Sequence, residues 1–137
     1  MIANTPIPND RASFNGALAA LHAEHATMRR LAACAARGAG FSTDDTLSLA
    51  DAMLAHERTE AGLFALPFLS RTPPAVTASA ARARQRCLEY TSGDFRLPAA
   101  DVAAVLFVEA LLAHLTAEES WLAQEKAAKN ERLWTAI

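Results

Sequence analysis

The sequence predicts an all-α fold, an antiparallel up-down-up-down four-helix bundle that forms a single domain over residues 1–137. Hydrophobic residues make up 52% of the chain, and Ala and Leu, which favour helix strongly, dominate them. Apolar residues recur at intervals of three and four, as they do along one face of a helix. Val, Ile, Thr and Tyr do not cluster into the alternating runs that are typical of strands. Four helices with short connections favour antiparallel neighbours.

Caps and prolines set the expected helix boundaries. The expected helices span about residues 10–37, 43–69, 75–91 and 99–129, after a loose N-terminal arm at 1–8. Ser42 or Thr43 is suited to cap the second helix. Pro67 is expected to bend or end its last turn, and Pro98 suits the first turn of the fourth helix. Trp134, in the tail, is expected to fold back on the bundle.

Charge and cysteine usage narrow the class of protein. The net charge of −2 gives no reason to expect nucleic acid or an anionic membrane as partner. We find no uninterrupted apolar run of eighteen residues and no basic segment followed by an apolar one, so we expect neither a membrane span nor a secretion signal. Cys34 and Cys87 form no CxxC pair, which favours a reducing, cytoplasmic compartment and a role as small core residues.

Two segments each place a histidine and a glutamate, one turn apart, on a helix face that also carries core residues. The segments are Leu49, Met53, His56, Glu60 and Leu63, and Phe107, Leu111, His114, Glu118 and Trp121. Both keep the spacing 4, 3, 4 and 3, and the two copies are offset by 58 residues. A buried carboxylate without a partner is costly or changes its protonation state, so each pair needs a partner.

A third helix adds to the same layer. His25 lies in the apolar stripe of the first helix, whereas His22 lies beside that stripe. In an up-down-up-down bundle, His56 and His114 differ in height by about 3 Å, and His25 reaches nearly the same level from the opposite direction. Imidazole and carboxylate without thiolate suit Fe, Mn, Zn or Ni. The alternative is a buried polar network in which His and Glu satisfy one another, and convergence from three helices favours the metal.

The segments AEHATMRRL, LAHERTEAGLFALPFL and LLAHLTAEESWLAQE resemble the hemerythrin-like, or HHE cation-binding, domain over about residues 14–125. Ferritin-type bundles are disfavoured because no Glu-x-x-His occurs. The resemblance implies a four-helix bundle with a non-haem di-iron centre, histidines from all four helices and two bridging glutamates. It also implies O₂ binding, sensing of O₂, NO or iron, or iron handling. The metal ligands that it implies are His25, His56, Glu60, His114, Glu118 and Glu57.

Within that set, the resemblance places His25 and His56 on one iron and His114 on the other. It makes Glu60 and Glu118 the bridging ligands. Glu57 matches a glutamate that also ligates in iron-sensing members. The departure lies in the third helix, where the expected histidine falls on Ala83, or on Ala80 one turn earlier. The substitutes that remain open are His22, Cys87 and Glu89.

Two hypotheses follow from this pattern. The first is a metal protein that holds one iron firmly and a second weakly or not at all, with Zn or Mn as alternative metals and O₂ or NO as ligands. The second is a metal-free bundle that acts as a structural or interaction module, which the missing histidine favours. The sequence offers no substrate pocket and no second catalytic group, so it does not predict an enzyme. It leaves the oligomeric state and the signal open.

Overall fold

The computed structural model describes residues 11–36, 41–66 and 69–129. The helices in these ranges are α1 (Arg11–Ala35), α2 (Thr43–Phe64), α3 (Pro74–Thr91) and α4 (Ala99–Lys129). The described residues contain no strand, which confirms the predicted all-α class and its four helices. The expected arm at 1–8, Pro67 and the tail with Trp134 lie outside the described residues.

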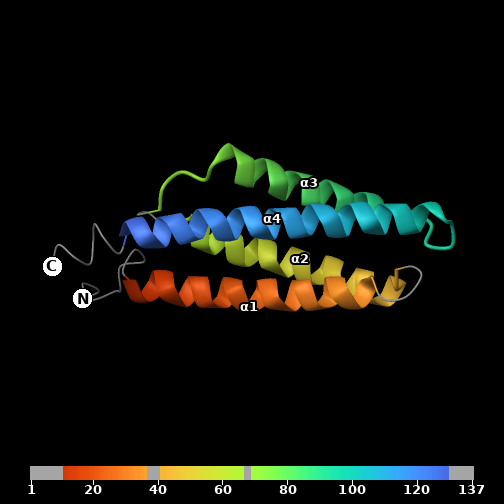
Figure 1. Cartoon of the computed structure of the whole chain (residues 1–137), viewed down its shortest axis with the longest axis horizontal. Coiled ribbons are helices and arrows are strands. Elements are labelled where there is room, and N and C mark those ends of the chain that lie inside the picture. The colour runs from red at the N-terminus through yellow and green to blue at the C-terminus, as the bar shows by residue number, and fades with distance from the viewer. Residues whose placement is uncertain (1–10, 37–40, 67–68, 130–137) are drawn as a thin grey trace, which may run out of the picture.

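The four helices lie along the long axis of the molecule, and the chain reverses direction at each connection (Figure 1). α1 packs mainly against α2, and α3 packs mainly against α4. In the view of Figure 1, α3 is inclined to α4, and the two are close where α3 ends and α4 begins. This arrangement brings residues that are far apart in the sequence into one layer at the middle of the bundle.

The start of α2 agrees with its expected cap, but its end does not agree with the sequence prediction. Ser42 is the cap residue, and its side-chain oxygen accepts a hydrogen bond from the Asp45 N–H at 3.2 Å. α2 ends at Phe64, so the predicted end near residue 69 is wrong. A proline disfavours the α conformation of the residue before it, so Pro67 stops the helix earlier. The Leu66 N–H then closes the last turn on the carbonyl oxygen of residue 63, at 3.1 Å.

The apolar core consists of two clusters, one on each side of a polar layer. The first contains Met28, Ala32, Leu49, Ala50, Met53, Ala83, Cys87, Phe107, Val108, Ala110, Leu111 and Leu115. The second contains Phe14, Leu18, Leu21, Leu63, Val76, Trp121 and Leu122. Between the two clusters lie His25 on α1, His56 on α2 and Glu118 on α4, all of them buried. The buried His114 lies one turn before Glu118, beside Leu115 of the first cluster. The polar layer is therefore enclosed by apolar side chains at both ends.

Among the described residues, one helix is long and apolar enough to cross a membrane on length and composition alone. It is α4, over Ala99–Ala128, with a mean hydropathy of 1.7. Its buried residues include His114, Glu118 and Glu125, and the Glu125 carboxylate accepts a hydrogen bond from the Ser70 N–H at 2.8 Å. A helix that is apolar nearly all round suits the core of a bundle as well as a membrane. The absence of a membrane span stays a prediction.

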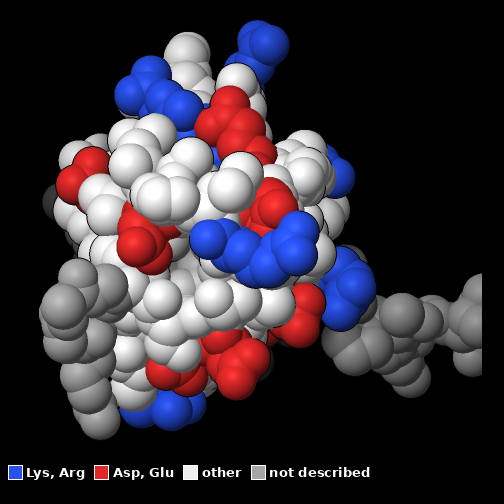
Figure 2. Space-filling view, turned by 90° about the vertical axis from the view of Figure 1, so that its right-hand side faces the viewer, with Lys and Arg blue, Asp and Glu red and all other residues white. Residues whose placement is uncertain are grey.

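Figure 2 shows the end of the molecule where α3 ends and α4 begins, and charged side chains of both signs lie there among other residues. Leu88, Leu97 and Val102 are more than half exposed in this region of the chain, at 57%, 55% and 60%. The basic and acidic side chains in that view are interspersed and do not gather into one patch of a single sign.

Candidate metal centre

The polar layer contains a triangle of ligand atoms contributed by three helices. His25 Nε2, from α1, lies 2.9 Å from Glu118 Oε1, from α4. His56 Nε2, from α2, lies 3.1 Å from the same oxygen. The two imidazole nitrogens are 3.2 Å apart. Two nitrogen atoms and one oxygen atom therefore face a common point, and all three residues are at most 1% exposed.

A second group of ligand atoms adjoins the triangle and shares Glu118 with it. His114 Nε2 lies 2.7 Å from Glu60 Oε2 and 3.5 Å from Glu118 Oε2. His56 Nε2 lies 3.4 Å from the same Glu60 oxygen. One ligand atom from each of His56, Glu60, His114 and Glu118 lies within 4.8 Å of the others. The two carboxylates therefore lie between the histidines of the two groups, as bridging ligands would.

Each of the three imidazoles is held from behind through its other nitrogen. The Nδ1 contacts are His25 to Glu119 Oε2 at 2.6 Å, His56 to Glu24 Oε1 at 2.7 Å, and His114 to Ser79 Oγ at 2.9 Å. An ionised carboxylate only accepts hydrogen bonds, so the first two Nδ1 atoms must carry the proton. The Ser79 hydroxyl donates to the Val76 carbonyl oxygen at 2.9 Å, so it accepts from His114. In the neutral form, each imidazole then directs an Nε2 lone pair into the layer.

These outer partners are themselves anchored. Arg29 donates two hydrogen bonds to Glu119, at 2.6 and 3.0 Å. The Arg29 hydrogen bond lowers the pKa of Glu119 to about 2, against a smaller opposing effect of burial. The Thr59 hydroxyl donates to Glu24 Oε2 at 2.6 Å. Histidines that bind metal in proteins almost always donate the second N–H to a carboxylate, a carbonyl or water, which fixes the ring and raises its basicity.

Sequence reasoning missed these outer partners because they lie off the apolar stripes. Glu24 and Glu119 do adjoin His25 and Glu118 in the chain, and that adjacency is the available sequence signal. It is a weak one, because Glu24 contacts the histidine of α2 rather than its own neighbour. Ser79 has no comparable signal.

Protons alone satisfy the layer poorly. If His25 and His56 both donate Nε2–H to Glu118, their two N–H groups face each other across 3.2 Å. Glu118 Oε2 is buried and has no hydrogen-bond partner among the described residues. A buried acceptor without a partner costs about 1–3 kcal/mol. A cation at this point would satisfy the nitrogen lone pairs and the free oxygen together.

The buried charges also perturb one another. Burial by itself would lower the pKa of His56, but hydrogen bonds to Glu118, Glu60 and Glu24 outweigh burial and raise that pKa to about 10. Burial opposes ionisation of Glu60, yet hydrogen bonds from His114 and His56 outweigh it and lower the pKa of Glu60. In the absence of a metal, the layer therefore holds a proton on His56 at neutral pH, and a metal must displace that proton.

The α3 side of the layer is open, as the missing histidine predicts. A cavity of about 10 Å³, enough for roughly one water molecule, is lined by Met53, His56, Glu57, Glu60, Ala80, Ala83 and His114. Both alanines on which the expected histidine falls thus face the centre. Glu57 also lines this cavity, and its carboxylate lies 3.8 Å from the guanidinium of Arg84.

None of the three substitute ligands lines this cavity. His22 is exposed, and its ring centroid is 6.4 Å from that of His25. Cys87 lies in the first apolar cluster, where burial, with smaller effects of two acidic groups, raises its thiol pKa to about 11. Glu89 is exposed and pairs with Arg86 at 3.0 Å. The structure places Glu57 beside the five predicted ligands that it brings together, which are His25, His56, Glu60, His114 and Glu118.

Comparisons of the chain with protein-family models, with curated proteins and with solved structures find no match. The site must therefore be interpreted from its own geometry and chemistry.

Proposed function

We propose that this protein binds a non-haem metal ion, iron in the first place, at the triangle of His25, His56 and Glu118. The observation that carries the proposal is the set of three contacts of 2.9, 3.1 and 3.2 Å between inward-facing ligand atoms. Ligands about 2.1 Å from one ion, on one face of an octahedron, are about 3 Å apart. Two histidines and one carboxylate on such a face, with open positions opposite, favour Fe(II) among the common metals.

The proposal includes a second, weaker position at His114, Glu60 and Glu118 Oε2. Those atoms carry no fourth protein ligand from α3, because Ala80 and Ala83 stand there. Glu57 is the remaining acidic side chain that lines the cavity. An ion with few protein ligands exchanges readily, so we expect about one tightly held ion per chain. Zn and Mn fit the same nitrogen and oxygen atoms and are the alternative metals.

We also propose that the protein is hemerythrin-like, with an antiparallel up-down-up-down bundle. The quoted sequence segments and the two His-x-x-x-Glu pairs support it. An iron with open positions binds O₂, NO or water, which suits sensing or iron handling. The protein's own residues supply a buried layer lined by ligand atoms, and the Nδ1 partners keep its histidines oriented.

Elemental analysis of the untagged protein, purified without chelators, tests the proposal. We expect about one iron, zinc or manganese ion per chain, retained through dialysis. His56→Ala and Glu118→Ala, which each remove a member of the triangle, should lower that content, while His22→Ala, which removes an exposed histidine, should not. Equal loss from all three variants would contradict the site assignment.

Wild-type protein that takes up no metal, even after incubation with Fe(II) under anaerobic conditions, would overturn the proposal. Such a result would favour a metal-free structural or interaction module instead. The alanines on α3 are the observation on which that alternative rests.

A further inference from the structure

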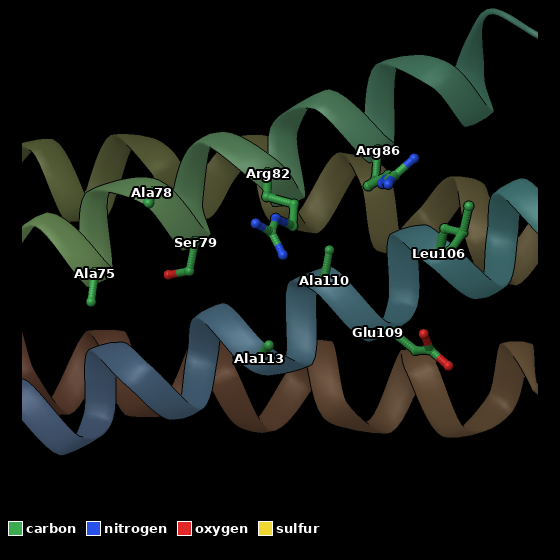
Figure 3. A pocket seen from close by; sticks show the side chains of 9 residues that line it. All are labelled: Ala75, Ala78, Ser79, Arg82, Arg86, Leu106, Glu109, Ala110 and Ala113. Carbon is green, nitrogen blue, oxygen red and sulfur yellow. The ribbon is translucent and has the colours of Figure 1, made fainter.

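A larger cavity is lined by residues of α3 and α4 (Figure 3). Its volume is about 430 Å³, within the range of small-molecule sites. The residues that line it are Ala75, Ala78, Ser79, Arg82, Arg86, Leu106, Glu109, Ala110 and Ala113. Four of the nine are alanines, so the facing helix surfaces leave space between them rather than interlocking.

The charges around this cavity favour an anion with a single charge. Arg82 and Arg86 come from α3, and Figure 3 shows the Arg82 side chain directed into the space between the two helices. Arg86 pairs with Glu89 at 3.0 Å, whereas Arg82 forms no ion pair with another described residue. Glu109, from α4, also lines the cavity. A carboxylate that accepts from Arg82 is favoured, and a dianion such as phosphate is disfavoured by Glu109.

The remaining surface of the cavity is apolar. Leu106 and the alanine methyl groups face the space and would contact a hydrocarbon chain. We propose that the α3–α4 cavity binds a small aliphatic monocarboxylate, with Arg82 as the partner of its carboxylate.

Ser79 lies between this cavity and the polar layer and contacts both. Its side chain lines the cavity, and its Oγ accepts the Nδ1–H of His114 at 2.9 Å. A ligand carboxylate that takes the Ser79 O–H away from the Val76 carbonyl would shift the imidazole behind it. Binding in the cavity therefore changes the environment of His114. This consequence requires no bound metal, so it does not depend on the proposed function.

Titration calorimetry of the full chain with hexanoate tests the proposal, on the protein as purified and again after chelation. We expect saturable binding in both states, weakened at least about tenfold in Arg82→Gln. Arg58→Gln removes another exposed arginine, from α2 and not among the residues that line the cavity, and should bind like the wild type. Inorganic phosphate and 1-hexanol should each bind much more weakly than hexanoate.

A second measurement follows the His114 ring nitrogens by NMR in the chelated protein. Hexanoate should shift their signals in the wild type and leave them unchanged in Arg82→Gln. Circular dichroism checks that each variant is folded. Equal affinity of Arg82→Gln and Arg58→Gln, or phosphate binding as tight as hexanoate, would overturn the proposal. Hexanoate binding that disappears on chelation would also overturn it, since the carboxylate would then be bound to the metal.

Discussion

The metal-free protein should lose stability as the pH rises from about 6.5 towards 10. His56 is the reason, because its pKa is about 10 in the folded chain against about 6.5 in an unfolded one. A group whose pKa is raised on folding stabilises the fold fully below its unfolded pKa, and the contribution disappears as the pH passes the folded pKa. The hydrogen bonds that His56 donates to Glu118, Glu60 and Glu24 are strongest from the imidazolium, and deprotonation weakens them.

The size of this effect follows from the pKa difference. One pKa unit corresponds to about 1.4 kcal/mol, so the free energy of unfolding should fall by about 1.4 kcal/mol per pH unit in this range. The whole change is on the order of 5 kcal/mol, which is comparable with the total stability of a small domain. A bound metal replaces the proton, and its affinity rises with pH because the ligands must be deprotonated. The metal-loaded protein should therefore keep its stability where the metal-free protein loses it.

Urea denaturation at intervals between pH 6.5 and 9.5, with and without metal, measures this dependence. His56→Gln should be less stable at pH 6.5 and should show a much flatter pH profile in the metal-free state. His22→Gln, which changes an exposed histidine, should keep the wild-type slope. Metal-free wild-type protein whose stability is constant or increases over this range would refute the assignment of a protonated His56 to the layer.

Three further predictions concern the ligands and their supports. Glu118→Gln keeps the side-chain volume but removes the charge and one acceptor oxygen at the centre of both groups, so metal content by elemental analysis should fall to near zero. Glu24→Gln should weaken metal affinity by about 10- to 100-fold in a chelator competition, because it loses the carboxylate behind His56, while Glu89→Gln on exposed α3 surface should have no effect. Ala80→His should raise the metal count towards two. Ala83→His, at a position 1% exposed within the first apolar cluster, should instead lower stability by about 1–3 kcal/mol in thermal denaturation. A metal count that rises with Ala83→His and not with Ala80→His would show that the register of α3 is wrong.

Helix periodicity was enough to predict the inner residues of the site. His25, His56 and His114 share stripes with core residues, and a residue on such a stripe points inward in any compact bundle. Periodicity does not determine whether the side chain of the residue that follows a stripe position also reaches the site. Glu57, directly after His56, lines the cavity opposite the small side chains that α3 presents there. The predicted end of α2 near residue 69 is wrong, because a proline also disfavours the α conformation of the residue before it, and the helix ends at Phe64.

The sequence by itself determined the helical class, the four helices and which face of each carries imidazole and carboxylate, because these depend on local propensity and on a period of 3.6 residues. The tertiary structure alone decided which nitrogen of each histidine faces inward, because Glu24, Ser79 and Glu119 approach from other helices. It also decided that two nitrogens and one oxygen meet about 3 Å apart, and that the alanines of α3 leave an opening beside them. Distances between helices depend on how side chains pack across the interface, and no single segment of the chain contains that information.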